Sequence, residues 1–76
     1  MIFLTIKDSS GNERRVNLIA DKFPMILNDG EADMVTNTSD FISDNNGDPE
    51  VVEAVTKMLH TRKEQPVGMG FTIRLR

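Results

Sequence analysis

One segment near the end of the chain, residues 49–63, has the local features of an amphipathic helix and limits the folds available. Asp48 is a good N-cap, and Pro49 suits the first helical position, where its missing N–H costs nothing. The helix must end before Pro66, because the residue preceding a proline is pushed out of α geometry. The apolar side chains repeat at helical spacing and form one stripe, consisting of Val51, Val52, Val55, Met58 and Leu59.

Strands are predicted at both ends of the chain, where apolar and polar side chains alternate. Residues 2–7 and 14–19 alternate on either side of a turn-forming segment, residues 8–12, which predicts a β-hairpin with a longer loop. Residues 70–76 alternate in the same way and predict a final strand. We expect the helical residues Val51, Val55, Met58 and Leu59 to pack on the strand residues Ile2, Leu4, Ile6, Val16, Phe71 and Ile73.

The middle of the chain leaves alternatives open. The apolar run at residues 23–27 contains Pro24, which indicates a strand start or an edge strand. Residues 28–30, Asn-Asp-Gly, favour a reversal, so residues 32–36 are either a returning strand or part of a short helical turn. Residues 37–48 are almost entirely polar apart from Phe41 and Ile42, and we interpret them as a loop held to the core by those two side chains. Residues 67–70 are expected to form a flexible join.

These elements predict a single α+β domain spanning residues 1–76, a small two-layer fold with one helix on a mostly antiparallel sheet. A helix that leads back into a sheet usually makes a right-handed crossover, which would place the C-terminal strand beside the N-terminal one. With 76 residues and no cysteine, the fold depends on a well-patterned core or on oligomerisation.

Charge is distributed unevenly along the chain. No lysine or arginine lies between Lys22 and Lys57, and the flanking segments carry the positive charge, so the net charge of −3 conceals a strong separation. Such a field attracts partners of opposite charge. The carboxylates of this segment are Asp29, Glu31, Asp33, Asp40, Asp44, Asp48, Glu50 and Glu53.

We therefore expect a non-enzymatic protein that binds a macromolecular partner, most simply a regulator or inhibitor that presents this acidic segment to a basic protein. In composition the chain resembles small acidic proteins of viruses and mobile elements that block nucleic-acid-binding enzymes. That resemblance implies a surface that mimics a polyanion such as nucleic acid.

Two alternatives remain open. If the terminal strands are neighbours, their outward face combines one aromatic ring with basic side chains, a surface that could hold nucleic acid or another polyanion by stacking and phosphate contact. Its residues are Phe3, Lys7, Arg15, Arg74 and Arg76. The other alternative is a structural or assembly subunit that forms homo-oligomers through an exposed strand edge.

Catalysis, cofactors and metals are not expected. Residues 42–53 partly match a calcium-binding loop, but the first ligand position is Ile42, which offers no side-chain oxygen. The single histidine, His60, lies on the helix face opposite the stripe and lacks metal-binding partners nearby in sequence. No apolar run reaches the length of about 20 residues that crosses a membrane, and the first residues lack the pattern of a secretory signal. We expect a cytoplasmic protein without membrane association.

Overall fold

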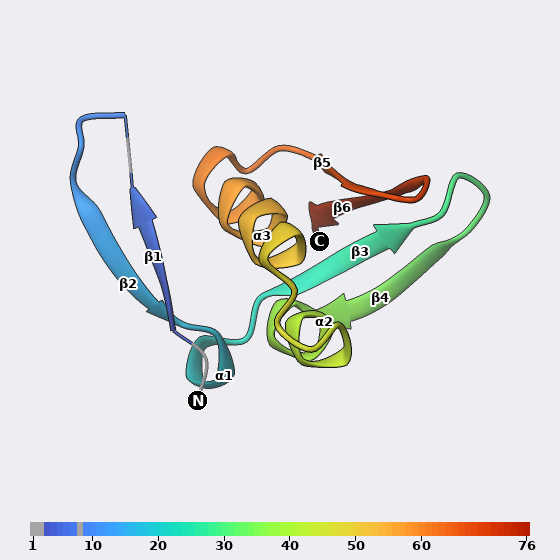
Figure 1. Cartoon of the computed structure of the whole chain (residues 1–76), viewed down its shortest axis with the longest axis horizontal. Coiled ribbons are helices and arrows are strands. Elements are labelled where there is room, and N and C mark those ends of the chain that lie inside the picture. Colours follow the sequence, from blue (N-terminus) through green and yellow to red (C-terminus); the bar gives the residue numbers. More distant parts are fainter. Residues whose placement is uncertain (1–2, 8) are drawn as a thin grey trace.

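The computed structural model describes residues 3–7 and 9–76. It contains six strands and three helices within these residues, shown in Figure 1. In chain order they are β1 (Phe3–Lys7), β2 (Glu13–Asn17), α1 (Leu18–Asp21), β3 (Pro24–Asn28), β4 (Asp33–Asn37), α2 (Thr38–Asp44), α3 (Pro49–Thr61), β5 (Gln65–Gly68) and β6 (Phe71–Leu75).

The strands form two separate antiparallel sheets. β1 and β2 pair as the expected N-terminal hairpin, while β4, β3, β6 and β5 form a four-stranded sheet in that order. Figure 1 shows α3 lying between the hairpin and the larger sheet. The predicted α+β class is confirmed, with a helix in the C-terminal half of the chain and a final strand after it.

The prediction that the C-terminal strand lies beside the N-terminal strand is wrong. β6 follows β5 through a two-residue turn and pairs with β5 and β3, both antiparallel, so it enters the sheet as part of a hairpin and not by a crossover. β5 includes Val67 and Gly68, the first half of the segment that we expected to form a flexible join. The alternation that predicts strands does not determine which strands pair, and here the short β5 provides the partner.

The core surrounds the apolar stripe of α3. Val55 and Met58 are completely buried, and they belong to one cluster with side chains of both sheets. The complete cluster consists of Leu4, Ile6, Val16, Leu18, Met25, Ile42, Val51, Ala54, Val55, Met58, Leu59 and Ile73. Most of the predicted packing is therefore confirmed. Ile2 lies outside the described residues, and Phe71 is only half-buried and lies outside the core cluster.

Residues 23–37 form a hairpin, which decides between the two alternatives for this segment. Pro24 is the first residue of β3, where a missing N–H is tolerated even though β3 is an inner strand. In the N-terminal hairpin, β2 ends at Asn17, and Leu18 already belongs to α1.

The loop expected at residues 37–48 is largely helical, because α2 occupies its first half. Thr38 and Ile42 are buried and Phe41 is half-buried, so the inward side chains follow helical spacing. Threonine at the first of these positions disguises the pattern, since its hydroxyl makes the segment look uniformly polar.

Candidate partner-binding surface

The eight carboxylates of the acidic segment fall into two groups. Three of them, apart from the N-cap residue Asp48, have partners within the fold. The Asp29 carboxylate accepts hydrogen bonds from the backbone N–H groups of Glu31 and Ala32, both at 2.9 Å, in the β3–β4 turn. The Asp33 carboxylate lies 3.1 Å from a guanidinium nitrogen of Arg74. Glu53 lies 3.8 Å from the Lys57 ammonium, one turn along α3.

The contacts of Asp29 and Asp33 also lower the pKa of their carboxyl groups. The side-chain amide of Asn28 donates a 2.6 Å hydrogen bond to Asp33. That bond and the Arg74 guanidinium hold the pKa of Asp33 below its usual value. The pKa of Asp29 is lowered as well, chiefly by the N–H groups of Ala32 and Glu31. Both carboxylates therefore serve local structure.

A second group of carboxylates lacks ionic partners within residues 3–7 and 9–76. Asp40 and Asp44 lie on α2, and Glu50 lies in the first turn of α3; all three are exposed. Asp48, between the two helices, accepts a 2.8 Å hydrogen bond from the backbone N–H of Glu50 and so acts as the predicted N-cap. The acidic residue Glu31 is exposed in the β3–β4 turn.

An apolar groove of about 590 Å³ opens beside this second group. Its apolar lining comes from both layers of the fold: Leu27, Met34, Phe41, Val51, Val67, Met69 and Phe71. Asp44, Asp48 and Glu50 also line it. We call this feature the acidic-rimmed groove.

The groove exists because the larger sheet extends beyond its helical cover. Figure 1 shows the ends of the sheet that carry the β3–β4 and β5–β6 turns projecting past α3. Met34 pairs with Leu27 across β4 and β3, and Met34 remains 52% exposed. Phe71 begins β6 at the same end of the sheet and lines the groove, which explains why it is not part of the core cluster.

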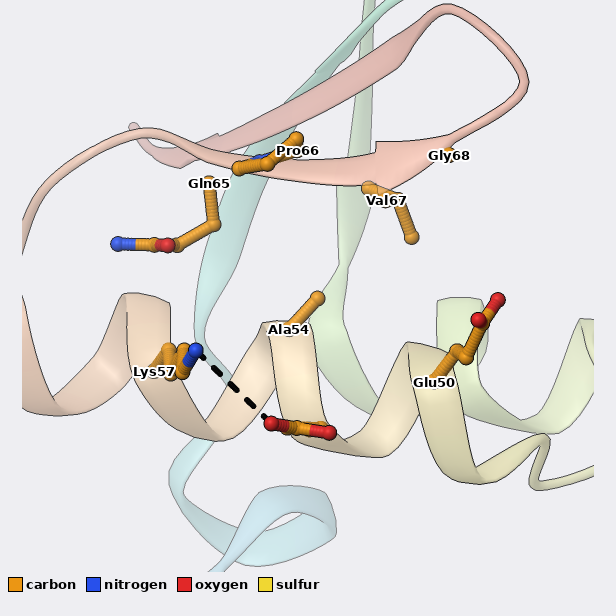
Figure 2. A pocket seen from close by; sticks show the side chains of 8 residues that line it. Glu50, Ala54, Lys57, Gln65, Pro66, Val67 and Gly68 are labelled. Atoms are coloured by element: carbon orange, nitrogen blue, oxygen red, sulfur yellow. Dashed lines mark ion pairs between the residues drawn. The ribbon is translucent and has the colours of Figure 1, made fainter.

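A smaller groove of about 270 Å³ continues from the first, between α3 and β5 (Figure 2). The two grooves share Glu50, Val67 and Gly68. Figure 2 shows Val67 directed from β5 toward α3, and it also shows the ion pair between Lys57 and Glu53. Because its charged side chains are partly neutralised in this way, the smaller groove adds length to the surface but little net charge.

The turn between β5 and β6 carries an unusual residue. Met69 has a φ of 54° and the following Gly70 a φ of 81°, the pattern of a type I′ hairpin turn. Asparagine, aspartate or glycine normally occupies the first position, since other side chains are strained at positive φ by about 1–2 kcal/mol. The Met69 side chain is nevertheless 95% exposed and borders the groove.

The alternative basic face is not assembled. Phe3, Lys7 and Arg15 lie on the N-terminal hairpin, whereas Arg74 belongs to β6 of the larger sheet and Arg76 follows it. The guanidinium carbon of Arg15 lies 4.2 Å from the Phe3 ring centroid, so this ring is already covered by a cation. Arg74 is occupied by Asp33 and, at 4.0 Å, by Glu64. The five residues therefore do not form the continuous surface that the sequence suggested.

Sequence reasoning missed the groove itself. Its floor exists because the larger sheet extends beyond the helices that cover it, and no local sequence pattern predicts how far a sheet extends beyond its helices. Met69 was the one available signal, because an apolar side chain between two glycines in a turn has no local structural role.

Among the residues that the structure describes, no group of three or more histidine or carboxylate side chains could hold a metal ion. His60 is exposed on α3, and Ile42, at the first position of the calcium-loop pattern, is buried within α2. Over the same residues, no helix combines the length and the apolar character needed to cross a bilayer. No protein-family model, curated protein or solved structure matches this chain.

Proposed function

We propose that this protein binds a basic protein partner and acts as a regulator or inhibitor, with the surface formed by α2, the α2–α3 connection and the start of α3. The observation that supports the proposal is the position of Asp40, Asp44 and Glu50, which are exposed and unpaired within the described residues. Opposite charges in water are attracted over about 10 Å at moderate salt, so such a surface accelerates and orients encounter with a cationic partner.

The test compares two variants with equal changes in net charge. The first, D40N/D44N/E50Q, removes unpaired carboxylates of the proposed surface and retains Asp48, because that side chain caps α3. The control, E13Q/D21N/E64Q, removes three carboxylates outside the acidic segment. We expect immobilised protein to capture a basic partner from lysate at low salt, the control to retain that partner, and the first variant to lose most of it. Equal capture by both variants would contradict the proposal.

Salt and DNA define the kind of partner. Raising the salt concentration should release the captured protein, because exposed charges are screened. If the surface mimics a polyanion, duplex DNA added in the wash should compete and release the partner too. Retention in the presence of DNA would restrict the proposal to a regulator that does not act as a nucleic-acid mimic.

A further inference from the structure

We propose that the acidic-rimmed groove binds the apolar side of a basic amphipathic helix in the partner protein. This inference rests on the proposed function and specifies its partner: the groove takes apolar anchor side chains, while lysine or arginine side chains beside them meet the carboxylates. The argument has three parts, which concern the floor of the groove, its rim and the turn at its border.

The floor offers mainly side-chain contacts, and the edge strands β4 and β5 contribute Met34 and Val67 to the lining of the groove. Leu27 and Phe71 lie on β3 and β6, the two inner strands of the larger sheet. A partner that enters here cannot add a strand to those inner strands, whose backbone groups are already paired. An extended partner could pair only with the edge strands β4 or β5, beside the floor and not over Leu27 and Phe71, so a helix laid into the groove is the mode that uses the floor. The volume of about 590 Å³ falls within the range of pockets that enclose ligand groups.

The composition of the floor also favours binding of apolar side chains. Met34 and Met69 are both more than half exposed and border the same groove as Phe71. Methionine is flexible and polarisable, and it is common on surfaces that adapt to apolar anchors of partner helices. An aliphatic side chain that displaces water from this lining buries apolar surface, which lowers the free energy of the complex.

The rim selects the charge of the partner. Asp44, Asp48 and Glu50 line the groove, and the part of it that the structure describes contains no lysine or arginine. Lysine and arginine residues flanking the apolar anchors of a helix would place their charges at this rim, whereas an acidic helix would be repelled.

The turn at Met69 supplies an independent indication. Its positive φ disfavours methionine, and the fully exposed side chain gives nothing to the fold in return. Strained positions that bring no structural benefit concentrate at binding sites. A methionine that borders an apolar groove has a role if it contacts a partner.

The experiment uses the intact protein labelled with ¹³C at the methionine methyl groups, and three defined peptides. The first peptide is an amphipathic helix of leucine and lysine, about 18 residues or five turns long. In the second, glutamine replaces leucine, and in the third, glutamate replaces lysine. Met34 and Met69 report on the groove, while the fully buried Met25 and Met58 serve as internal references.

We expect the leucine–lysine peptide to shift the Met34 and Met69 signals and to leave those of Met25 and Met58 nearly unchanged. Met34→Thr should weaken the affinity of the protein for the leucine–lysine peptide about tenfold, the effect of losing one well-packed apolar contact. Val35→Thr is the matched control: Val35 is the next residue on β4, is 59% exposed and does not line the groove. The affinity of the Val35→Thr variant for the leucine–lysine peptide should stay within about twofold of that of the original protein.

Met69→Asn separates binding from folding. Asparagine is favoured where Met69 stands, so this variant should melt at a higher temperature and still bind the leucine–lysine peptide more weakly. A variant that is more stable and binds equally well would show that Met69 does not contact the peptide and would overturn this part of the proposal.

The outcomes distinguish the two proposals. If the glutamine–lysine peptide binds as tightly as the leucine–lysine peptide, the groove proposal is wrong and the acidic-surface proposal stands. If the leucine–glutamate peptide binds equally well, or if no peptide binds, the groove proposal is wrong, and the acidic-surface proposal is decided by the capture experiment with the two charge variants. If the Met34 and Met69 signals move with protein concentration alone, the groove is occupied by a second copy of this chain, and the proposal of a partner helix is wrong.

Discussion

Thr38, the first residue of α2, carries the one buried side-chain polar atom that lacks a hydrogen-bond partner within the described residues. Its backbone N–H donates to the Phe23 carbonyl at 3.1 Å, but the hydroxyl is left without a partner in the core. An unsatisfied buried polar group costs roughly 1–3 kcal/mol.

Replacing Thr38 with valine should therefore raise the free energy of unfolding by about 1 kcal/mol, because valine has nearly the same shape and leaves no buried hydroxyl unsatisfied. Urea denaturation followed by circular dichroism measures the change. Thr38→Ala is the control, since it removes the same hydroxyl but leaves a void. A Thr38→Val protein less stable than the original would indicate that the hydroxyl makes a bond in solution.

The ion pair between Asp33 and Arg74 predicts a pH dependence with a definite sign. The pKa of Asp33 is lowered in the folded protein, chiefly by Asn28 and next by Arg74, from its usual value of 3.8. The stabilisation by this carboxylate is thus present above that value and is lost as the pH falls below it toward the lowered pKa. Arg74→Met should raise the pKa of Asp33, measured by a carbon-13 titration of its carboxyl group. The titration of Asp29, whose partners are backbone N–H groups, should remain unchanged.

Among the elements, α3 was the most predictable, because its cap, its first-turn proline and its apolar stripe all agree. β6 was predictable from its strict alternation, and the N-terminal hairpin from alternation together with the turn-forming sequence of residues 8–12. α2 was missed because Thr38 replaces an apolar residue in its buried stripe. β5 was missed because Pro66 and Gly68 are residues that weaken a strand.

The central position of α3 predicts a graded response to truncation. Val55 is completely buried and Val52 only half-buried, so the two positions allow the same chemical change in different surroundings. Val55→Ala should lower the free energy of unfolding by about 2–4 kcal/mol, and Val52→Ala by clearly less. Equal losses in denaturant titrations would mean that α3 does not pack with the orientation described.

For the whole molecule, the sequence predicted the helix and the strands of the two terminal segments better than the way in which they assemble. One sheet seemed sufficient because each terminal segment alternates, but alternation fixes which side of a strand is buried and not its neighbours. The separation into two sheets divides the predicted basic face, with Phe3 on one sheet and Arg74 on the other. The same arrangement leaves the larger sheet with more apolar surface than α2 and α3 cover, and that uncovered surface is the floor of the groove.

The two sheets should nevertheless unfold together, because α3 joins them through one core. Leu4 of β1 and Ile73 of β6 belong to the same buried cluster, although their strands do not pair. Leu4→Ala should lower the free energy of unfolding by about 2–5 kcal/mol and reduce hydrogen-exchange protection in β6 as much as in β1. Because Leu4 does not line the groove, the folded variant should bind the leucine–lysine peptide with unchanged affinity. Loss of protection confined to the hairpin would instead show that β1 and β2 open independently, with the groove carried by the four-stranded sheet and its helices alone.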